Sequence, residues 1–267
     1  MSISTGERMK ITILGARGSV PTEGADMLEF GGATSCVLIE TDTWAVFFDA
    51  GTGIINAPDV GDKKIAIFLT HPHADHLLGL PFFPYITKDN HIDFYAVKKG
   101  DLTARQQLDK YLSPPLWPCP VEAYPARFEF HDIEFPVKLG DITITGIPSV
   151  HPGGSVIYRL EHNEDCFVYA TDYEYEEKTV GDLIEFSKDT DLILMDGQYT
   201  EEEYAKRRGY GHSTPAQGMR VLRESGAGAI RFVHHDPTHT DEFLRKMEAE
   251  IKCENASFAR KGEVIYL

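Results

Sequence analysis

The chain has 267 residues, with 26 Lys and Arg against 42 Asp and Glu, so its formal net charge at pH 7 is −16. This balance argues against a large nucleic-acid partner, because phosphate contacts need clustered Lys and Arg, and equally against an anionic membrane surface. No apolar run approaches the ~20 residues of a membrane span. Four well-separated Cys and an N-terminus unlike a signal peptide predict a cytoplasmic protein.

The first half of the chain is predicted to be rich in strands. Runs of β-branched and aromatic residues between Gly-rich turns indicate strands over 10–15, 34–41, 44–51, 64–70 and 91–97. A helix is expected over 101–112. The next segment, 113–128, contains five Pro, which exclude regular structure over most of its length. Either it is an active-site flap, with aromatic side chains such as Trp117 as a wall, or it is a long packed connection.

The second half alternates strands and helices. Strands are predicted over 141–150, 155–160, 166–171, 192–196 and 229–235, and helices over 179–189, 214–226 and 240–252. Thr214 and Gln217 form a capping box, with Pro215 at the first helical position. The pattern predicts a single α/β unit with two comparable β-rich halves.

Many of the 11 His lie where predicted strands end. The run His71-Pro72-His73-Ala74-Asp75-His76 directly follows the strand over 64–70. Other strand ends carry His151, Asp172, Asp196 and His234. Imidazole and carboxylate ligands without thiolate suit zinc, iron or manganese. The sequence therefore predicts a metal site on loops at a sheet edge.

The spacing of the run after the strand suggests two ions. His71 and His73 are two residues apart, so in extended backbone they share a face and can bind one ion. Asp75 and His76 then point elsewhere and can bind a second. Both ions need further ligands, for which the candidates are His151, Asp172 and His234. Two ions ~3.5–4 Å apart can hold and activate a hydroxide for hydrolysis.

The remaining His divide into surface and undecided positions. His91, His131 and His162 are expected at the surface. His234 and His235 are adjacent and would point to opposite faces if the strand continues, so only one can be a ligand. The position of the strand end favours His234, with His235 as a residue that orients a ligand.

The run from Thr70 to His76 resembles the signature of the metallo-β-lactamase superfamily, and Asp49-Ala50-Gly51, His151, Asp172 and a late His follow its order. The resemblance covers about residues 9 to 267 and implies one domain, 1–267, folded as a four-layer αββα sandwich. It implies one metal held by His71, His73 and His151, and a second held by Asp75, His76 and His234. Asp172 would bridge them, and Asp49 would support a ligand or a turn.

A second motif narrows the branch. Gly211-His212-Ser213-Thr214 resembles the motif of ribonuclease Z-like and phosphodiesterase-like members, as do residues 15–19 and 31–35. The resemblance implies that His212 assists the leaving group or stabilises charge on a phosphoryl oxygen. Asp196 could orient it. Catalytic roles are thus assigned to His212 and to the candidate ligand Asp75, and Arg17 would contact a substrate phosphate or pair with a surface carboxylate.

The favoured function is a dinuclear metal-dependent hydrolase that uses a metal-bound hydroxide on a small, linear or cyclic phosphodiester. Zinc is the favoured metal, with manganese or iron as alternatives. Other functions left open are a tRNA 3′-processing endonuclease, a lactone or thioester hydrolase, and a non-catalytic metal-binding protein. The charge of −16 weakens the tRNA alternative. No membrane partner is expected, and a homodimer is expected by analogy with relatives.

Overall fold

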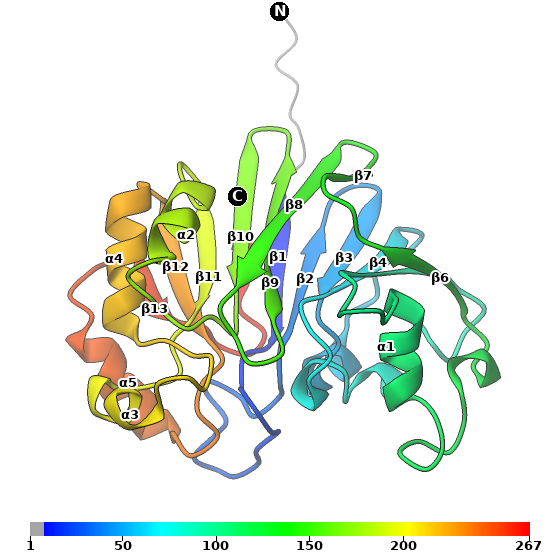
Figure 1. Cartoon of the computed structure of the whole chain (residues 1–267), viewed down its shortest axis with the longest axis horizontal. Helices are drawn as coiled ribbons and strands as arrows, with labels where there is room; N and C mark the ends of the chain where they lie inside the picture. The colour runs from blue at the N-terminus through cyan, green and yellow to red at the C-terminus, as the bar shows by residue number, and fades with distance from the viewer. Residues whose placement is uncertain (1–7) are drawn as a thin grey trace, which may run out of the picture.

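Two facing β-sheets form the centre of the structure, a computed structural model that describes residues 8–267 (Figure 1). The first sheet has the strand order β14-β1-β2-β3-β4-β5-β6. Its strands are β1 (Lys10–Gly15), β2 (Cys36–Glu40), β3 (Trp44–Phe48), β4 (Lys64–Leu69), β5 (His91–Ala96), β6 (Arg127–Asp132) and β14 (Val264–Tyr266). Pairing is antiparallel from β14 to β3 and parallel from β3 to β6.

The second sheet repeats this plan with the order β13-β12-β11-β10-β9-β8-β7. Its strands are β7 (Val137–Leu139), β8 (Ile142–Ser149), β9 (Ser155–His162), β10 (Asp165–Ala170), β11 (Leu192–Asp196), β12 (Ala229–Val233) and β13 (Ala256–Phe258). Pairing is antiparallel from β7 to β10 and parallel from β10 to β13. Each half therefore contributes a run of parallel strands.

Helices cover the two outer faces. The helix α1 (Ala104–Tyr111) lies on the first sheet. The second sheet carries α2 (Val180–Phe186), α3 (Glu201–Arg207), α4 (Pro215–Ser225) and α5 (Asp241–Glu250) on its side of the molecule. This arrangement confirms the predicted αββα sandwich. Among the described residues, no helix combines the length and apolar character needed to cross a bilayer.

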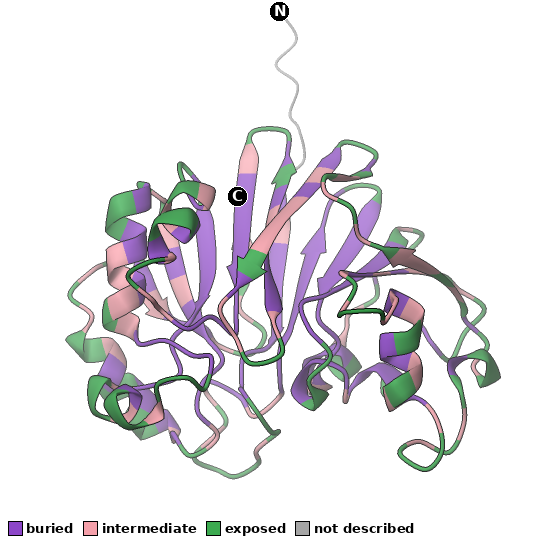
Figure 2. Ribbon diagram, in the orientation of Figure 1, coloured by how far each residue is buried: buried purple, intermediate pink, exposed green. Residues whose placement is uncertain are grey.

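The core lies between the sheets and on both outer faces. Aromatic side chains of both sheets meet in the central layer, where Phe48 packs against Phe68, Tyr158, Phe167 and Tyr169 at ring-centroid distances of 5.2–6.0 Å. Figure 2 shows the central strands almost wholly buried, as their sequences require, because strands covered on both faces are nearly continuous apolar runs. The carboxyl ends of the parallel strands thus present loops along one edge, where ligands bind in open α/β sheets.

Some elements depart from the sequence-based expectations. The sequence did not predict α3, whose seven residues bury only Tyr204 and so carry no apolar stripe. The strand β6 was also not predicted, nor were β7, β13 and β14, whose three residues each are too few for a periodic pattern. The Pro-rich segment has only one short 3-10 turn, Val121–Ala123, before β6 begins, in agreement with the exclusion drawn from its Pro content.

Candidate metal centre

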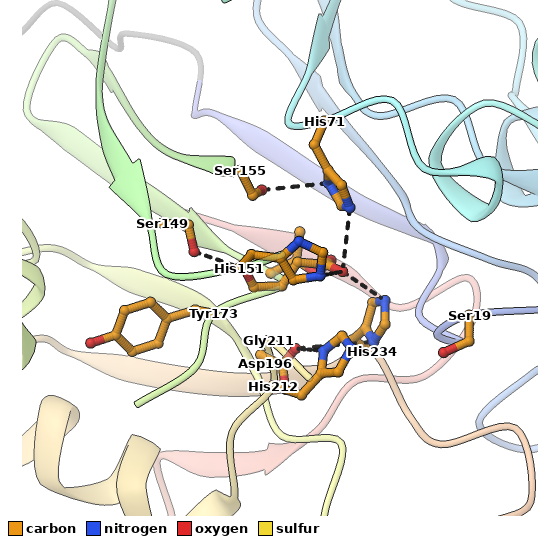
Figure 3. A network of polar contacts seen from close by, with 12 residues as sticks. Ser19, His71, Ser149, His151, Ser155, Tyr173, Asp196, Gly211, His212 and His234 are labelled. Carbon is orange, nitrogen blue, oxygen red and sulfur yellow. Dashed lines mark hydrogen bonds and ion pairs between the residues drawn. The ribbon is translucent and has the colours of Figure 1, made fainter. Parts of the chain in front are cut away.

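The seven predicted ligands lie together at one edge of the sandwich, although they come from four separate loops. The loop after β4 carries four of them and includes a short 3-10 turn, Ala74–His76. The loops after β8, β10 and β12 carry His151, Asp172 and His234. Figure 3 shows His71, His151 and His234 facing one another from three of these loops, with His212 beside them on the loop between α3 and α4.

One group consists of three imidazoles. His71, His73 and His151 each offer a nitrogen, and these atoms lie within 4.8 Å of one another. The ring of His71 lies 4.3 Å from that of His73 and 4.6 Å from that of His151. His71 is 1% exposed, whereas His73 is exposed, so this group opens to solvent on one side.

A second group lies beside it. The ligand atoms of Asp75, His76 and His234 are also within 4.8 Å of one another. The Oδ2 atom of Asp75 lies 3.2 Å from Nε2 of His234 and 3.4 Å from Nε2 of His76. The backbone amide of Ser19 donates a hydrogen bond of 2.8 Å to the same oxygen and holds the carboxylate in place.

Asp172 lies between the two groups. Its Oδ1 atom is 3.7 Å from Nε2 of His71 and 3.5 Å from Nε2 of His151. Toward the other group, Oδ1 lies 3.2 Å from Nε2 of His234, and Oδ2 lies 3.2 Å from Nε2 of His76. A carboxylate in this position can contact ions in both groups.

The electrostatics of the site reflect its burial and its mixed charges. Burial lowers the pKa of His71 and lowers that of His151 to about 4. Burial alone would also lower the pKa of His234, but Asp172 and the hydrogen bond to Asp75 raise it to about 9. Burial alone would raise the pKa of Asp172, yet the surrounding imidazoles keep it well below its usual range.

The arrangement of ring nitrogens fits bound cations. The Nε2 atoms of His71 and His76 are buried without any hydrogen-bond partner, and both face the shared carboxylate. The opposite nitrogens are engaged: Nδ1 of His71 lies 3.1 Å from the hydroxyl oxygen of Thr70, and Nδ1 of His76 lies 2.7 Å from Oδ2 of Asp49. Nδ1 of His234 likewise lies 3.1 Å from Oε1 of Gln198. Metal-binding His residues commonly use their second nitrogen in this way. The donor set therefore fits two divalent ions.

Asp49 is the main supporting residue. It is fully buried with a φ of 62°, and its Oδ1 atom accepts a hydrogen bond of 2.8 Å from the amide of Thr70. Its other oxygen receives the His76 contact and a hydrogen bond of 3.3 Å from the hydroxyl of Tyr169. The carboxylate thus connects the strand that precedes the metal-site loop with the facing sheet.

His212 lies at the side of the centre with Asp196. Its Nδ1 atom is 2.8 Å from Oδ2 of Asp196, whose other oxygen accepts a hydrogen bond of 2.9 Å from the amide of Ser213. The ring stacks on His234 with a centroid distance of 4.6 Å and lies 5.6 Å from His151. The hydroxyl of Thr214 caps α4, which agrees with the capping box read from the sequence.

The structure distinguishes the two adjacent histidines. His234, with a φ of 63°, turns into the cluster, whereas Nε2 of His235 donates a hydrogen bond of 2.8 Å to the carbonyl of Ala259. The His235 ring packs against Phe30 and Phe258, and burial lowers its pKa to about 3. His235 therefore stabilises the core, and the expectation that it orients a ligand is wrong.

Two further expectations are corrected. Arg17 is fully buried and donates hydrogen bonds to the carbonyls of Gly31, Asp236 and His239, so it contacts neither a substrate site nor a surface carboxylate. His162 is 5% exposed, not a surface residue, and its Nε2 lies 3.1 Å from Oδ2 of Asp141. The local sequence pattern could not place either residue, because the partners of both are distant in the sequence.

The surroundings of the centre differ between the two halves. Trp117 donates a hydrogen bond of 2.9 Å to the hydroxyl of Tyr124, and both pack on the outer core of the first sheet, as expected for a long packed connection. A cavity of about 1070 Å³ opens beside His151 on the other half. Its lining includes Glu174, Tyr175 and Arg208.

Comparison with known proteins agrees with this geometry. Residues 43–235, more than half of the chain, match the model of the beta-lactamase superfamily domain. The chain belongs to this family, and it is a metal-dependent hydrolase, as the sequence predicted. The probable metallo-hydrolase YhfI of Bacillus subtilis (strain 168) is 23% identical over 277 residues, which cover 96% of this chain and 99% of YhfI.

Two of the similar solved structures have the same fold, and a further relative is similar in sequence. The crystal structure of YhfI has a TM-score of 0.74 at 19% identity and covers 98% of this chain and all of that one. A diphosphatase from the PhnP family has a TM-score of 0.69 at 20% identity, with 97% and 98% covered. The ribonuclease Z of Haloferax volcanii is 22% identical over 273 residues, which are 85% of this chain and 84% of the relative.

Proposed function

We propose that this hydrolase is a dinuclear phosphodiesterase that acts on small phosphodiesters, with zinc as its metal. The observation that carries the proposal is the shared position of Asp172 between two ligand groups, with a buried His212–Asp196 pair beside them. Relatives named ribonuclease Z and diphosphatase support chemistry at phosphorus. We also propose that the described chain acts as one domain, since its two sheets share a core.

The ligand assignment follows the two groups. His71, His73 and His151 would hold one ion, Asp75, His76 and His234 the other, and Asp172 both. Bound divalent ions lower the pKa of a coordinated water and offset negative charge on phosphoryl oxygens. The Nε2 atoms of His76 and His234 need no rearrangement to face this space, because their Nδ1 atoms are already held by Asp49 and Gln198.

His212 would supply the proton that the leaving group needs. Its Nδ1 atom is engaged by Asp196, which leaves Nε2 to carry the proton and release it to the departing oxygen. The contact with Asp196 also holds the ring in the orientation that this role needs. A leaving oxygen that is protonated as the P–O bond breaks departs as an alcohol, which lowers the barrier most for poor leaving groups.

Asp75 would act through its charge. Burial alone would raise the pKa of this carboxyl, but His76 and His234 lower it well below its usual range. A carboxylate that stays ionised in this way orients an attacking water by accepting its hydrogen bond, and it is a poor acceptor of the proton itself.

Substrate size is the second part of the proposal. The net charge of −16 disfavours approach of a large polyanion, whereas two bound ions would make the site itself locally positive. The cavity beside His151 offers room for one substituent of a small diester. The homodimer remains a prediction without a structural test.

A substrate panel tests the proposal. We expect hydrolysis of bis-p-nitrophenyl phosphate and of at least one cyclic or linear nucleotide diester with Zn²⁺ or Mn²⁺, and about two ions per chain by metal analysis. His212→Ala should lower kcat about 100-fold or more with both ions retained, while His91→Ala, on the exposed end of β5, should leave kcat unchanged. Hydrolysis of lactones or thioesters alone would refute the phosphodiesterase. Tight tRNA binding at physiological salt would favour tRNA processing.

A further inference from the structure

A buried carboxylate with no part in the proposed chemistry lies next to the metal centre. Glu174 follows Asp172 by two positions and is 7% exposed. Its Oε1 atom accepts a hydrogen bond of 2.6 Å from the amide of Gly209, and Oε2 accepts one of 2.9 Å from the amide of Gly211. No Lys, Arg or His side chain within residues 8–267 forms an ion pair with it. A buried charge is costly without compensation, so these two amides are its main partners.

The turn held by this carboxylate is unusual in its backbone. Gly209 and Gly211 have φ angles of 90° and 94°, a region that other residues rarely adopt. A Cβ atom on Gly211 would lie 2.2 Å from Cδ2 of His151, so the turn is in close contact with that imidazole. His212 is the next residue. A displacement of the turn would therefore move His212 and remove the support of the His151 ring together.

The segment that carries Glu174 is also tied to its neighbours through other bonds. The amide of Glu174 donates a hydrogen bond of 2.8 Å to the carbonyl of Val150, and the hydroxyl of Ser149 donates one of 2.7 Å to the carbonyl of Asp172. Ser213 donates from its hydroxyl to the carbonyl of Tyr173. The segment 172–174 is thus connected on one side to the residues before His151 and on the other to those around His212.

We infer that Glu174 is a positioning residue whose carboxylate holds the Gly209–Gly211 turn, so that His212 and the His151 ring keep a fixed position relative to Asp172. Glu174 acts through these residues and touches no reacting atom. The inference rests on the proposed function for one point, the role of His212 toward the leaving group. Its geometric part, the control of the turn by the carboxylate, is independent of any substrate.

Glu174→Gln is the informative change. A Gln side chain offers one acceptor oxygen, and its amino group faces the second N–H, so one of the two bonds is lost. We expect kcat for a dialkyl-type diester with a poor leaving group to fall about tenfold with KM within twofold, because this reaction depends most on His212. The rate with bis-p-nitrophenyl phosphate should fall less than about threefold. Glu176→Gln is the matched control, since Glu176 lines the same cavity and its carboxylate pairs with Lys178 at 3.0 Å.

A measurement without substrate separates this inference from the proposed function. Amide hydrogen exchange at Gly209 and Gly211 should become about tenfold or more faster in Glu174→Gln, with metal content unchanged. If the native protein hydrolyses no diester, the proposed function fails, and the exchange rates still decide the role of Glu174. Equal losses for good and poor leaving groups, or native exchange rates, would overturn the inference. If Glu174→Gln does not fold, Glu174→Asp replaces it, because Asp keeps the charge on a shorter side chain. Glu174→Asp must then slow the diester with the poor leaving group more than bis-p-nitrophenyl phosphate.

Discussion

Replacement of Asp49 by Asn removes the acceptor that faces Nδ1 of His76 and, at the same position, the acceptor of the long 3.3 Å hydrogen bond from the Tyr169 hydroxyl. The Oδ2 atom of Asp49 lies 2.7 Å from Nδ1 of His76, so the carboxylate accepts the proton on that nitrogen and directs Nε2 toward the metal site. Asn has nearly the same volume, can adopt the φ of 62°, and keeps an acceptor for the amide of Thr70. Its amino group then opposes Nδ1–H of His76 and favours the other tautomer, which blocks the ligand atom.

The expected loss of metal affinity follows from the lost contact between Asp49 and His76. Loss of a partner that orients a metal-binding His lowers metal affinity about 10–100-fold. At about 1.4 kcal/mol per factor of ten, the weakening is about 1.4–2.8 kcal/mol for the ion at His76. Burial raises the pKa of Asp49, so the charged form is already disfavoured, and a neutral replacement should change the Tm of the metal-free protein little.

The assay is a zinc titration in competition with a chromophoric chelator. The variant should show one site weakened by this factor and the other within about threefold of the native affinity. Asp141→Asn is the control, because Asp141 forms a similar contact of 3.1 Å with His162 away from the centre. Native affinity at both sites in Asp49→Asn would refute the reasoning. An equal loss in the control would show that the effect is not local.

Three further predictions concern stability. Gly211→Ala should destabilise the protein by about 1–3 kcal/mol, because it combines an unfavourable φ with a close contact to His151. Gly209→Ala should destabilise it less, since nothing lies within 4 Å of the Cβ position there. Chemical denaturation measures both losses, and equal losses would contradict the role of the contact. Arg17→Met should lower the free energy of unfolding, measured by chemical denaturation, by at least about 3 kcal/mol, because it leaves buried carbonyls without donors. A loss below about 1 kcal/mol would be inconsistent with this account. In the metal-free protein, the pKa of His234 is about 9, above the ~6.5 of an unfolded His. The protonated His234 therefore stabilises the fold fully below pH ~6.5, and this stabilisation is lost as the pH rises through about 9. The Tm should fall over this pH range, and it should fall less in His234→Gln.

Much of the site could be predicted from local sequence because its residues follow strands. The H-x-H-x-D-H run comes directly after a buried apolar strand, and the other candidates follow β8, β10 and β12, whose ends meet at one edge of the sandwich. The order of elements predicted one α/β unit with two β-rich halves, and the αββα arrangement was implied by the resemblance to the metallo-β-lactamase superfamily. The structure brings all seven candidate ligands together, and their role in metal binding stays a prediction.

Apolar runs and their ends are local properties, so the order of residues was enough to predict which strands carry His and Asp to the site. The direction of each side chain, and the distant groups that support it, depend on how the two sheets pack. His234 rather than His235 enters the cluster because of one backbone angle, a φ of 63° that ends β12. The supports provided by Asp49, Gln198 and Glu174 depend on contacts between segments far apart in the chain; Glu174, for example, bonds to amides 35 and 37 positions further along. Local periodicity contains no information about such contacts, because they arise only when the two sheets pack together.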